Sequence, residues 1–134
     1  MAQGGRQGAR RLLLQALYQS QVGGQTLEVL TQQFRASAEF RAVDQAYFLA
    51  MLPAVLANTE SLDKLIGACA DRPVEQLDPV EHAALWIGLQ ELTARDDIPT
   101  GVAINEAVEL AREFGAQDSY RYVNAILDTA ARDA

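Results

Sequence analysis

The 134-residue sequence predicts an all-α protein of about seven helices. Apolar residues recur at helical spacing in successive segments, and glycine, proline or capping residues separate those segments. No stretch alternates convincingly between apolar and polar residues with period two, so no sheet is expected. The length suits a single hydrophobic core, and we expect residues 1–134 to form one domain.

The N-terminal region combines a polar arm with a helix. Residues 1–8 are polar and glycine-rich, and we expect them to form a flexible basic arm. The leucines between Ala9 and Val22 predict a helix with one buried side, which ends at Gly23. Three arginines lie at or before the exposed start of this helix: Arg6, Arg10 and Arg11. Cations there oppose the helix dipole, so this end is either a solvated basic terminus or a site for an anion.

The middle of the chain predicts a short helix and then a buried pair. Thr26 is expected to cap a helix that continues to about Arg35. The dense apolar stretch over residues 44–70 predicts two packed helices. Pro53 is expected to kink the first of them or to mark its new start.

A capping signal marks the next helix, which is expected over residues 78–93. Asp78 is the N-cap, Pro79 stands at the first helical position, and Glu81 completes a reciprocal capping box. The helix is nearly apolar, so it should cross the middle of the molecule. His82 in its first turns is expected at the surface.

The clearest periodicity lies between Val102 and Asp128, where two helices are expected to meet at a tight corner. The apolar face of the first helix is predicted to consist of Ile104, Ala107, Val108, Ala111 and Phe114. Gly115 is expected to end it in the left-handed conformation, and Asp118 or Ser119 to cap the next helix. The second helix is predicted to bury Val123, Ile126, Leu127 and Ala130.

The first turn of this last helix reads Ser119-Tyr120-Arg121-Tyr122. Two aromatic rings beside a cation near a helix N-terminus provide stacking faces, a positive charge and free backbone donors. The turn is equally compatible with a structural role, in which one tyrosine packs inward and Arg121 pairs with a surface carboxylate.

The charge is unevenly distributed along the chain. The net charge is −7, but residues 1–24 contain three arginines and no acid, so the remainder carries −10. An acidic body with one basic end allows a local anion site and disfavours general binding to nucleic acid. No apolar run reaches the roughly 18 residues of a membrane span, and the N-terminus does not resemble a secretory signal. We therefore expect a cytoplasmic protein.

The residue inventory favours binding over catalysis. One cysteine, Cys69, and one histidine, His82, allow neither an internal disulfide nor a zinc site, and no cofactor is expected. Three glutamates on one solvated helix face have no histidine, metal set or glycine-rich phosphate loop beside them: Glu106, Glu109 and Glu113. The sequence therefore predicts that the protein is not an enzyme.

Several strings, in this order along nearly the whole chain, resemble the NusB family of bacterial transcription antitermination factors. They are ARRLLLQALYQ, DQAYF, NTESLD, LDPVE, IPTGVAINEAVELAREFG and DSYRYVNAILD. The last two are the most specific. A related RNA-binding domain is fused to RNA cytosine methyltransferases, but this chain has no room for the methyltransferase.

The resemblance implies a fold of seven helices in two packed bundles and an activity in binding. It implies a heterodimer with the small-subunit ribosomal protein NusE, which binds single-stranded boxA RNA of ribosomal RNA transcripts within the RNA polymerase antitermination complex. Carried over by position, the implied RNA-binding residues are Arg6, Arg10, Arg11, Tyr18, Phe114, Asp118, Ser119, Arg121 and Tyr122. The implied partner-binding residues are Arg72, Glu75 and Glu81. Gln7 and Gly8 interrupt an arginine run that is denser in many members of the family.

Both lines of reasoning lead to the same expectation. Single-stranded RNA is held by cations along its backbone and by aromatic side chains that stack on its bases. We expect the first helix and the 114–122 corner to form one RNA-binding face, with Asp118 opposing the phosphates. An alternative is an acidic adaptor that binds a basic ribosomal partner without touching RNA. A homodimer that buries the first helix would hide the RNA face, and the sequence leaves the oligomeric state open.

Overall fold

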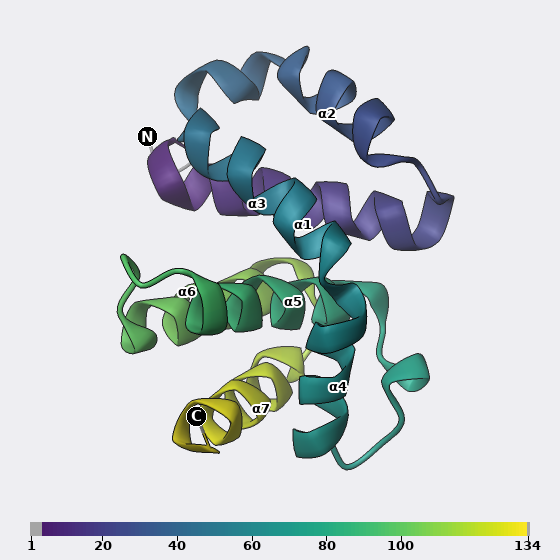
Figure 1. Ribbon diagram of the computed structural model, residues 1–134, viewed down its shortest axis with the longest axis vertical. Helices are drawn as coiled ribbons and strands as arrows, with labels where there is room; N and C mark the ends of the chain where they lie inside the picture. Colours follow the sequence, from purple (N-terminus) through teal and green to yellow (C-terminus); the bar gives the residue numbers. More distant parts are fainter. Residues whose placement is uncertain (1–3, 134) are drawn as a thin grey trace. The chain divides into compact units, whose positions relative to one another are not determined.

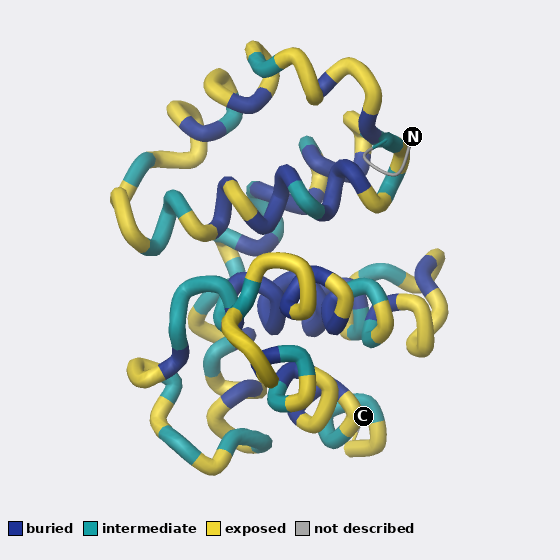
Figure 2. The backbone as a smooth tube through the Cα atoms, turned by 180° about the vertical axis from the view of Figure 1, so that it is seen from behind, coloured by how far each residue is buried: buried dark blue, intermediate teal, exposed yellow. Residues whose placement is uncertain are grey.

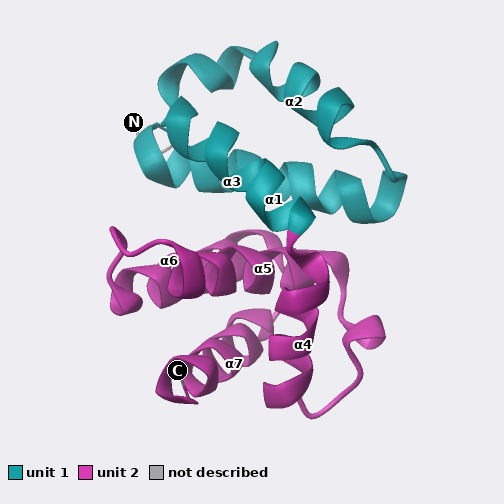
Figure 3. Cartoon of the chain, in the orientation of Figure 1, with its two compact units in different colours: residues 1–57 teal, residues 58–134 magenta. Residues whose placement is uncertain are grey.

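The computed structural model describes residues 4–133, and over that range the chain forms seven α-helices and two short 3-10 helices (Figure 1). No strand is found among the described residues, and an isolated bridge joins Gly5 to Val43. The prediction of an all-α fold with about seven helices is confirmed. The helices group into two compact units, residues 1–57 and residues 58–134 (Figure 3). None of the described helices is both long and apolar enough to cross a membrane.

The first unit is a small bundle built on its N-terminal helix. Its elements are α1 (Gly5–Gly23), α2 (Leu27–Arg35), η1 (Ala38–Ala42) and α3 (Gln45–Ala57). Helix α1 packs against the other three elements, and α2 packs against α3 (Figure 1). The ring of Phe48 lies at the centre, with centroids 5.6 Å from Phe34 and 5.5 Å from Phe40. Aromatic packing of this kind stabilises the bundle beyond the apolar area that it buries.

Side-chain caps fix two helix starts in this unit. Thr26 Oγ1 accepts a hydrogen bond from the Val29 amide at 3.2 Å, which confirms the predicted cap of α2. Asp44 Oδ1 accepts from the Tyr47 amide at 3.0 Å at the start of α3. Helix α3 then continues through Pro53 to Ala57. Pro53 therefore lies inside the helix and does not begin a new one.

The predicted flexible arm over residues 1–8 is wrong for residues 5–8, because α1 begins at Gly5 rather than at Ala9. The Asp44 amide donates to the Gly5 carbonyl at 3.0 Å, and Arg6 Nε lies 2.9 Å from Asp44 Oδ2. These two contacts with the start of α3 hold the first turn in place. Residues 1–3 of the predicted arm lie outside the described residues.

The second unit is built on a buried central helix. Its elements are α4 (Thr59–Cys69), η2 (Val74–Gln76), α5 (Pro79–Ala94), α6 (Thr100–Phe114) and α7 (Ser119–Asp133). Helices α5, α6 and α7 pack against one another, and α4 packs against α5 and α7 (Figure 1). Every residue from Ala83 to Glu91 is buried, so α5 is the central helix of this unit (Figure 2).

A glycine allows the three helices to approach closely. A Cβ atom added at Gly88 would lie 2.7 Å from Leu127 Cδ1 and 3.1 Å from Ala107 Cβ. Distances this short leave no space for a methyl group unless the buried Leu127 side chain rotates and α6 moves by a few tenths of an ångström. Gly88 of α5 therefore sets the spacing between α5 and its two neighbours.

The corner between α6 and α7 differs from the prediction in its backbone. Gly115 has φ −88° and ψ 176°, so it is extended and does not adopt the left-handed conformation. The positive φ, 74°, occurs at Asp118, one of the few residue types that tolerate it. Gly115 is required for space instead, because a Cβ there would lie 2.6 Å from the Ala111 carbonyl oxygen and 3.0 Å from Ser119 Cβ. The missing side chain lets Ser119 fold back against the end of α6.

Candidate nucleic-acid interface

The α6–α7 corner presents aromatic and charged side chains to solvent. Phe114, the last residue of α6, is 36% exposed, although its periodicity predicted a buried position. Asp118 and Arg121 are exposed and lie 3.5 Å apart, measured from Asp118 Oδ1 to Arg121 Nε. An exposed ring and an exposed guanidinium on the same corner provide the two kinds of contact that single-stranded nucleic acid uses.

Ser119 faces the interior of the second unit. It is 4% exposed, and its Oγ donates a hydrogen bond to Glu81 Oε2 at 2.8 Å. Glu81 is 6% exposed at the start of α5, so the structure places this predicted partner-binding residue inside the unit. The Asp78 cap of α5 is confirmed by a 2.8 Å bond from the Glu81 amide, but the Glu81 side chain binds Ser119.

Glu81 also connects to an arginine that covers Tyr122. Arg72 Nη2 lies 3.7 Å from Glu81 Oε1, and the Arg72 guanidinium carbon lies 3.9 Å from the centre of the Tyr122 ring. The nearby Tyr122 hydroxyl, followed by the carboxylates of Glu81 and Asp71, raises the pKa of Arg72 above its ordinary value, although burial acts in the opposite direction. The Tyr122 hydroxyl oxygen is buried and has no hydrogen-bond partner among the described residues. Tyr122 therefore offers its ring, rather than its hydroxyl, to other groups.

These contacts join residues that the sequence assigned to two different functions. Ser119 and Tyr122 were predicted to bind RNA, whereas Arg72 and Glu81 were predicted to bind a protein partner. The structure brings all four together beside a hollow of about 350 Å³, which Asp118 also lines. Glu75, on the exposed 3-10 helix η2, is the predicted partner-binding residue that is openly accessible.

The N-terminal candidates lie in the first unit and differ in exposure. Arg10 is 3% exposed, so its predicted position at an exposed helix start is wrong. Its guanidinium carbon lies 5.4 Å from the centre of the Tyr47 ring, and that of Arg6 lies 4.7 Å from the same ring. Arg11 is half-buried, and Tyr18 is 41% exposed. That α1 and the 114–122 corner form one face stays a prediction.

A second aromatic–arginine cluster lies on α6 and α7, and the sequence reasoning missed most of it. The guanidinium carbon of Arg112 lies 4.1 Å from the centre of the Tyr120 ring, and that of Arg121 lies 5.6 Å from it. Tyr120 and, after it, Asp118 raise the pKa of Arg121 above its ordinary value. Asn105 lies near this cluster, on the same side of α6 as Arg112. The helical spacing of these two residues is the sequence signal that could have located the cluster.

His82 is not the exposed residue that the pattern predicted. Its Nε2 lies 2.6 Å from Asp63 Oδ1, and Trp86 Nε1 donates to the same oxygen at 2.8 Å. The histidine and tryptophan rings pack at 4.3 Å between centroids. This cluster ties α4 to α5, and no group of three metal-binding side chains was found among the described residues.

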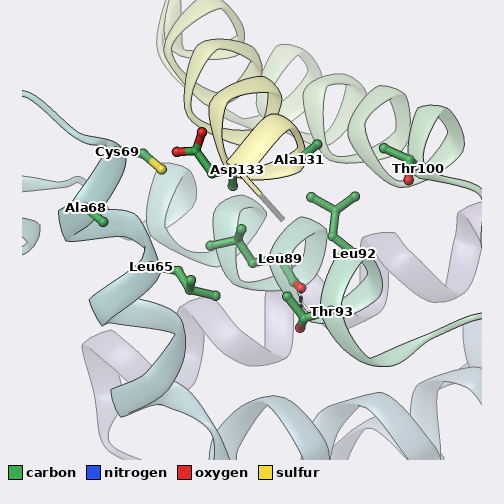
Figure 4. A pocket seen from close by; sticks show the side chains of 10 residues that line it. Leu65, Ala68, Cys69, Leu89, Leu92, Thr93, Thr100, Ala131 and Asp133 are labelled. Carbon is green, nitrogen blue, oxygen red and sulfur yellow. Dashed lines mark hydrogen bonds between the residues drawn. The ribbon is translucent and has the colours of Figure 1, made fainter.

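A pocket of about 200 Å³ lies among α4, α5, α6 and α7 (Figure 4). Its lining is mostly apolar, with Cys69 and Asp133 at its polar side. Burial, and then Asp133, raises the pKa of the Cys69 thiol above its ordinary value of 9.0. A higher thiol pKa lowers the share of thiolate, which is the nucleophilic form of cysteine.

Two helical units, one with an exposed corner of aromatic and arginine side chains, define an all-α binding protein. The model of the NusB family matches residues 7–132. The chain belongs to the NusB family.

Similar proteins cover nearly the whole chain. The transcription antitermination protein NusB of Alcanivorax borkumensis is 46% identical over 127 residues, which are 95% of this chain and 85% of that protein. The protein of the same name from Shewanella pealeana is 44% identical, over 92% of this chain and 91% of its own length.

Two solved structures share the fold. T. maritima NusB has a TM-score of 0.83 at 26% identity, over 96% of this chain and 91% of that chain. A structure of the antitermination factors NusB and NusE in complex with dsRNA has a TM-score of 0.78 at 18% identity, over 96% of both chains. At 18% identity, the second structure shows that the fold is shared and nothing more.

Proposed function

We propose that this protein is a transcription antitermination factor that binds single-stranded boxA RNA of ribosomal RNA transcripts together with the ribosomal protein NusE. The observation that carries the proposal is the α6–α7 corner, where Phe114 and Arg121 are exposed in a member of the NusB family. Binding of this kind needs no catalytic group. The two units would act as one RNA-binding domain of a cytoplasmic protein, within the RNA polymerase antitermination complex.

The corner is suited to RNA because stacking and charge come together there. A base that stacks on Phe114 or on the Arg72–Tyr122 pair gains about 1–3 kcal/mol, and Arg121 supplies charge for a phosphate. Arg11 and Tyr18 of α1 would also contact RNA. The buried residues Arg10 and Ser119 would each act by holding the helices of their own unit in place, since neither side chain is open to solvent.

The acidic body suits a basic ribosomal partner. A net charge of −7 favours association with a positively charged protein and restricts non-specific RNA binding. Glu75 is accessible on η2 and would contact NusE directly. Glu81 would support the same region from inside the unit. A homodimer that covers α1 would compete with RNA and would therefore be an inactive form.

The experiment is a titration of fluorescently labelled single-stranded boxA RNA at two salt concentrations, with and without NusE. The test variant is Phe114→Ala/Arg121→Ala, and the matched control is Arg132→Ala, which removes an equally exposed arginine from the far end of α7. We expect salt-sensitive binding that NusE strengthens, a loss of at least tenfold in the double variant, and no loss in the control.

The alternative function predicts a different result. An adaptor that binds NusE without touching RNA would bind NusE equally in wild type and double variant. The RNA would then add nothing to the affinity for NusE, and no salt dependence of RNA binding could be measured. That outcome would refute the RNA-binding function, and binding to NusE would remain as the function of the protein.

A further inference from the structure

A shallow hollow of about 520 Å³ lies along α6 and α7, separate from the hollow beside Arg72 and Tyr122. The side chains that line it and bear on the argument are Asn105, Arg112, Tyr120, Arg121 and Asn124. Of these, Arg121 belongs to the predicted RNA-binding set, so the hollow adjoins the proposed RNA site at one residue. The other four have no function in the proposal so far.

The aromatic ring in the hollow lies beside two cations. The Arg112 guanidinium lies 4.1 Å from the Tyr120 ring centre, and the Arg121 guanidinium lies 5.6 Å from it. Arg121 Nε also donates a hydrogen bond to the Tyr120 hydroxyl oxygen at 3.2 Å. A guanidinium that lies over a ring presents its outer face for stacking on a base and its edge for binding a phosphate. The cluster therefore offers a ready-made binding surface.

The carboxylates beside the two arginines are weakly held. Arg112 Nε lies 3.3 Å from Glu109 Oε1, and Arg121 Nε lies 3.5 Å from Asp118 Oδ1. All four side chains are more than half exposed, and ion pairs of this kind contribute little to stability. A phosphate can therefore replace either carboxylate at small cost.

Two amides complete the hollow. Asn105 on α6 and Asn124 on α7 are both exposed, and each carries a donor and an acceptor. Single-stranded RNA is recognised by amides of this kind through the edges of its unstacked bases. Together the hollow provides stacking, positive charge and polar edges, which is the full set that one nucleotide requires.

We propose that this hollow is a second nucleotide-binding site, which takes the nucleotide next to the segment of single-stranded RNA bound at the α6–α7 corner. The site rests on the proposed function, and Arg121 is the residue shared by the two sites. Arg112 holds the phosphate or stacks on the base, and the two asparagines contact the base edge.

The test is a nested series of labelled single-stranded RNA oligonucleotides titrated into the full chain with NusE present. The series starts from the shortest oligonucleotide that binds and grows by one nucleotide at a time, separately at the 5′ and 3′ ends. We expect one extension, at one end, to tighten binding by about tenfold, as one further stacked base implies. In Arg112→Ala that gain should disappear, and the salt slope of the longer oligonucleotide should fall by about 0.7.

Two further variants separate binding from folding. Asn105→Ala/Asn124→Ala should also lose the gain, whereas Arg132→Ala should keep it, since Arg132 is an exposed arginine near the end of α7 and outside the hollow. All variants should bind the shortest oligonucleotide within about twofold of wild type, which shows that they are folded.

The outcomes distinguish the two proposals. If the shortest oligonucleotide binds but neither extension adds affinity, or if Arg112→Ala keeps the whole gain, the second site is refuted and the proposed function stands. If no oligonucleotide of any length binds, the proposed function fails and the second site fails with it.

Discussion

Ser119 donates a hydrogen bond to Glu81 at 2.8 Å, across 38 positions of sequence, and both side chains are buried. The bond joins the first turn of α7 to the first turn of α5. It therefore connects the surface that we assign to RNA with the surface around η2 that we assign to the protein partner. A change at either residue should affect both surfaces.

Removing the hydroxyl should destabilise the second unit. Ser119→Ala leaves a buried carboxylate oxygen without its donor, so we expect a loss of about 1–3 kcal/mol in the free energy of unfolding, measured by urea denaturation. Ser61→Ala on the exposed side of α4 is the control and should change little. In a double-mutant cycle with Glu81→Ala, which removes the acceptor, additive losses would show that the bond contributes nothing.

Removing the charge of Asp118 should tighten RNA binding. Asp118→Asn keeps a side chain that tolerates the positive φ of 74°, and it frees Arg121 from its ion pair. We expect the dissociation constant for boxA RNA to fall several-fold, with the larger effect at low salt. Glu109→Gln, at the pair with Arg112, serves as a comparison. An unchanged or weaker affinity in Asp118→Asn would remove this residue from the RNA site.

We expect Arg10 to contribute to the stability of the fold more than to RNA binding. The side chain is 3% exposed and lies over the Tyr47 ring. Arg10→Ala therefore removes a buried contact between the guanidinium and this ring. Loss of this desolvated cation–π contact should lower the free energy of unfolding by about 2 kcal/mol, detectable as a lower Tm. Arg11→Ala, at a half-buried position on the same helix, should cost less. Equal melting temperatures for Arg10→Ala and wild type would contradict the buried role.

Gly88 should not accept a side chain. The Cβ of Gly88→Ala would meet Leu127 Cδ1 at 2.7 Å and Ala107 Cβ at 3.1 Å. The better helix propensity of alanine favours the variant by about 1 kcal/mol, but overpacking costs about 1–3 kcal/mol, so we expect net destabilisation in urea. Gly101→Ala, where nothing lies near the added atom, should be neutral or stabilising and is the matched control. A more stable Gly88→Ala would mean that the three helices can separate freely.

Cys69 should react slowly in the folded protein. Burial and Asp133 raise the pKa of its thiol above 9.0, so at pH 8 the folded state has less thiolate than the unfolded state. We expect slower alkylation by iodoacetamide at pH 8 without urea than with it, and a faster native rate in Asp133→Asn. The Cys69 thiol keeps its proton to a higher pH in the folded state than in the unfolded state. Its contribution to stability is therefore fully present below pH 9 and is lost as the pH rises further. Asp128→Asn is the control, and equal rates in both variants would exclude an influence of Asp133.

The elements of the fold could be predicted from local sequence, because their signals lie within a few residues of one another. Asp78 and Pro79 mark the start of α5, Thr26 marks the start of α2, and an unbroken apolar run identifies α5 as central. Helical periodicity likewise placed Val123, Ile126 and Leu127 in the core.

The side-chain partners could not be predicted, because they are tertiary. The capping-box pattern predicts that the Glu81 carboxylate bonds with Asp78 at the N-cap, but this carboxylate accepts a hydrogen bond from Ser119. His82 looked exposed because its pattern does not reveal Asp63, and Arg10 looked exposed because the pattern does not reveal Tyr47. Phe114 shows the reverse error, since periodicity places every apolar residue in the core whatever lies beside it.

The backbone at Asp118 also bears on how this protein can change over time. A positive φ at an exposed position admits aspartate, asparagine and glycine at little cost and excludes most other residues. Aspartate is one nucleotide substitution away from asparagine and from glycine in the genetic code. A single mutation can therefore remove a negative charge from the corner that we propose to bind RNA while keeping a residue that tolerates this backbone. If the corner binds RNA, the strength of binding can evolve in small steps at this position.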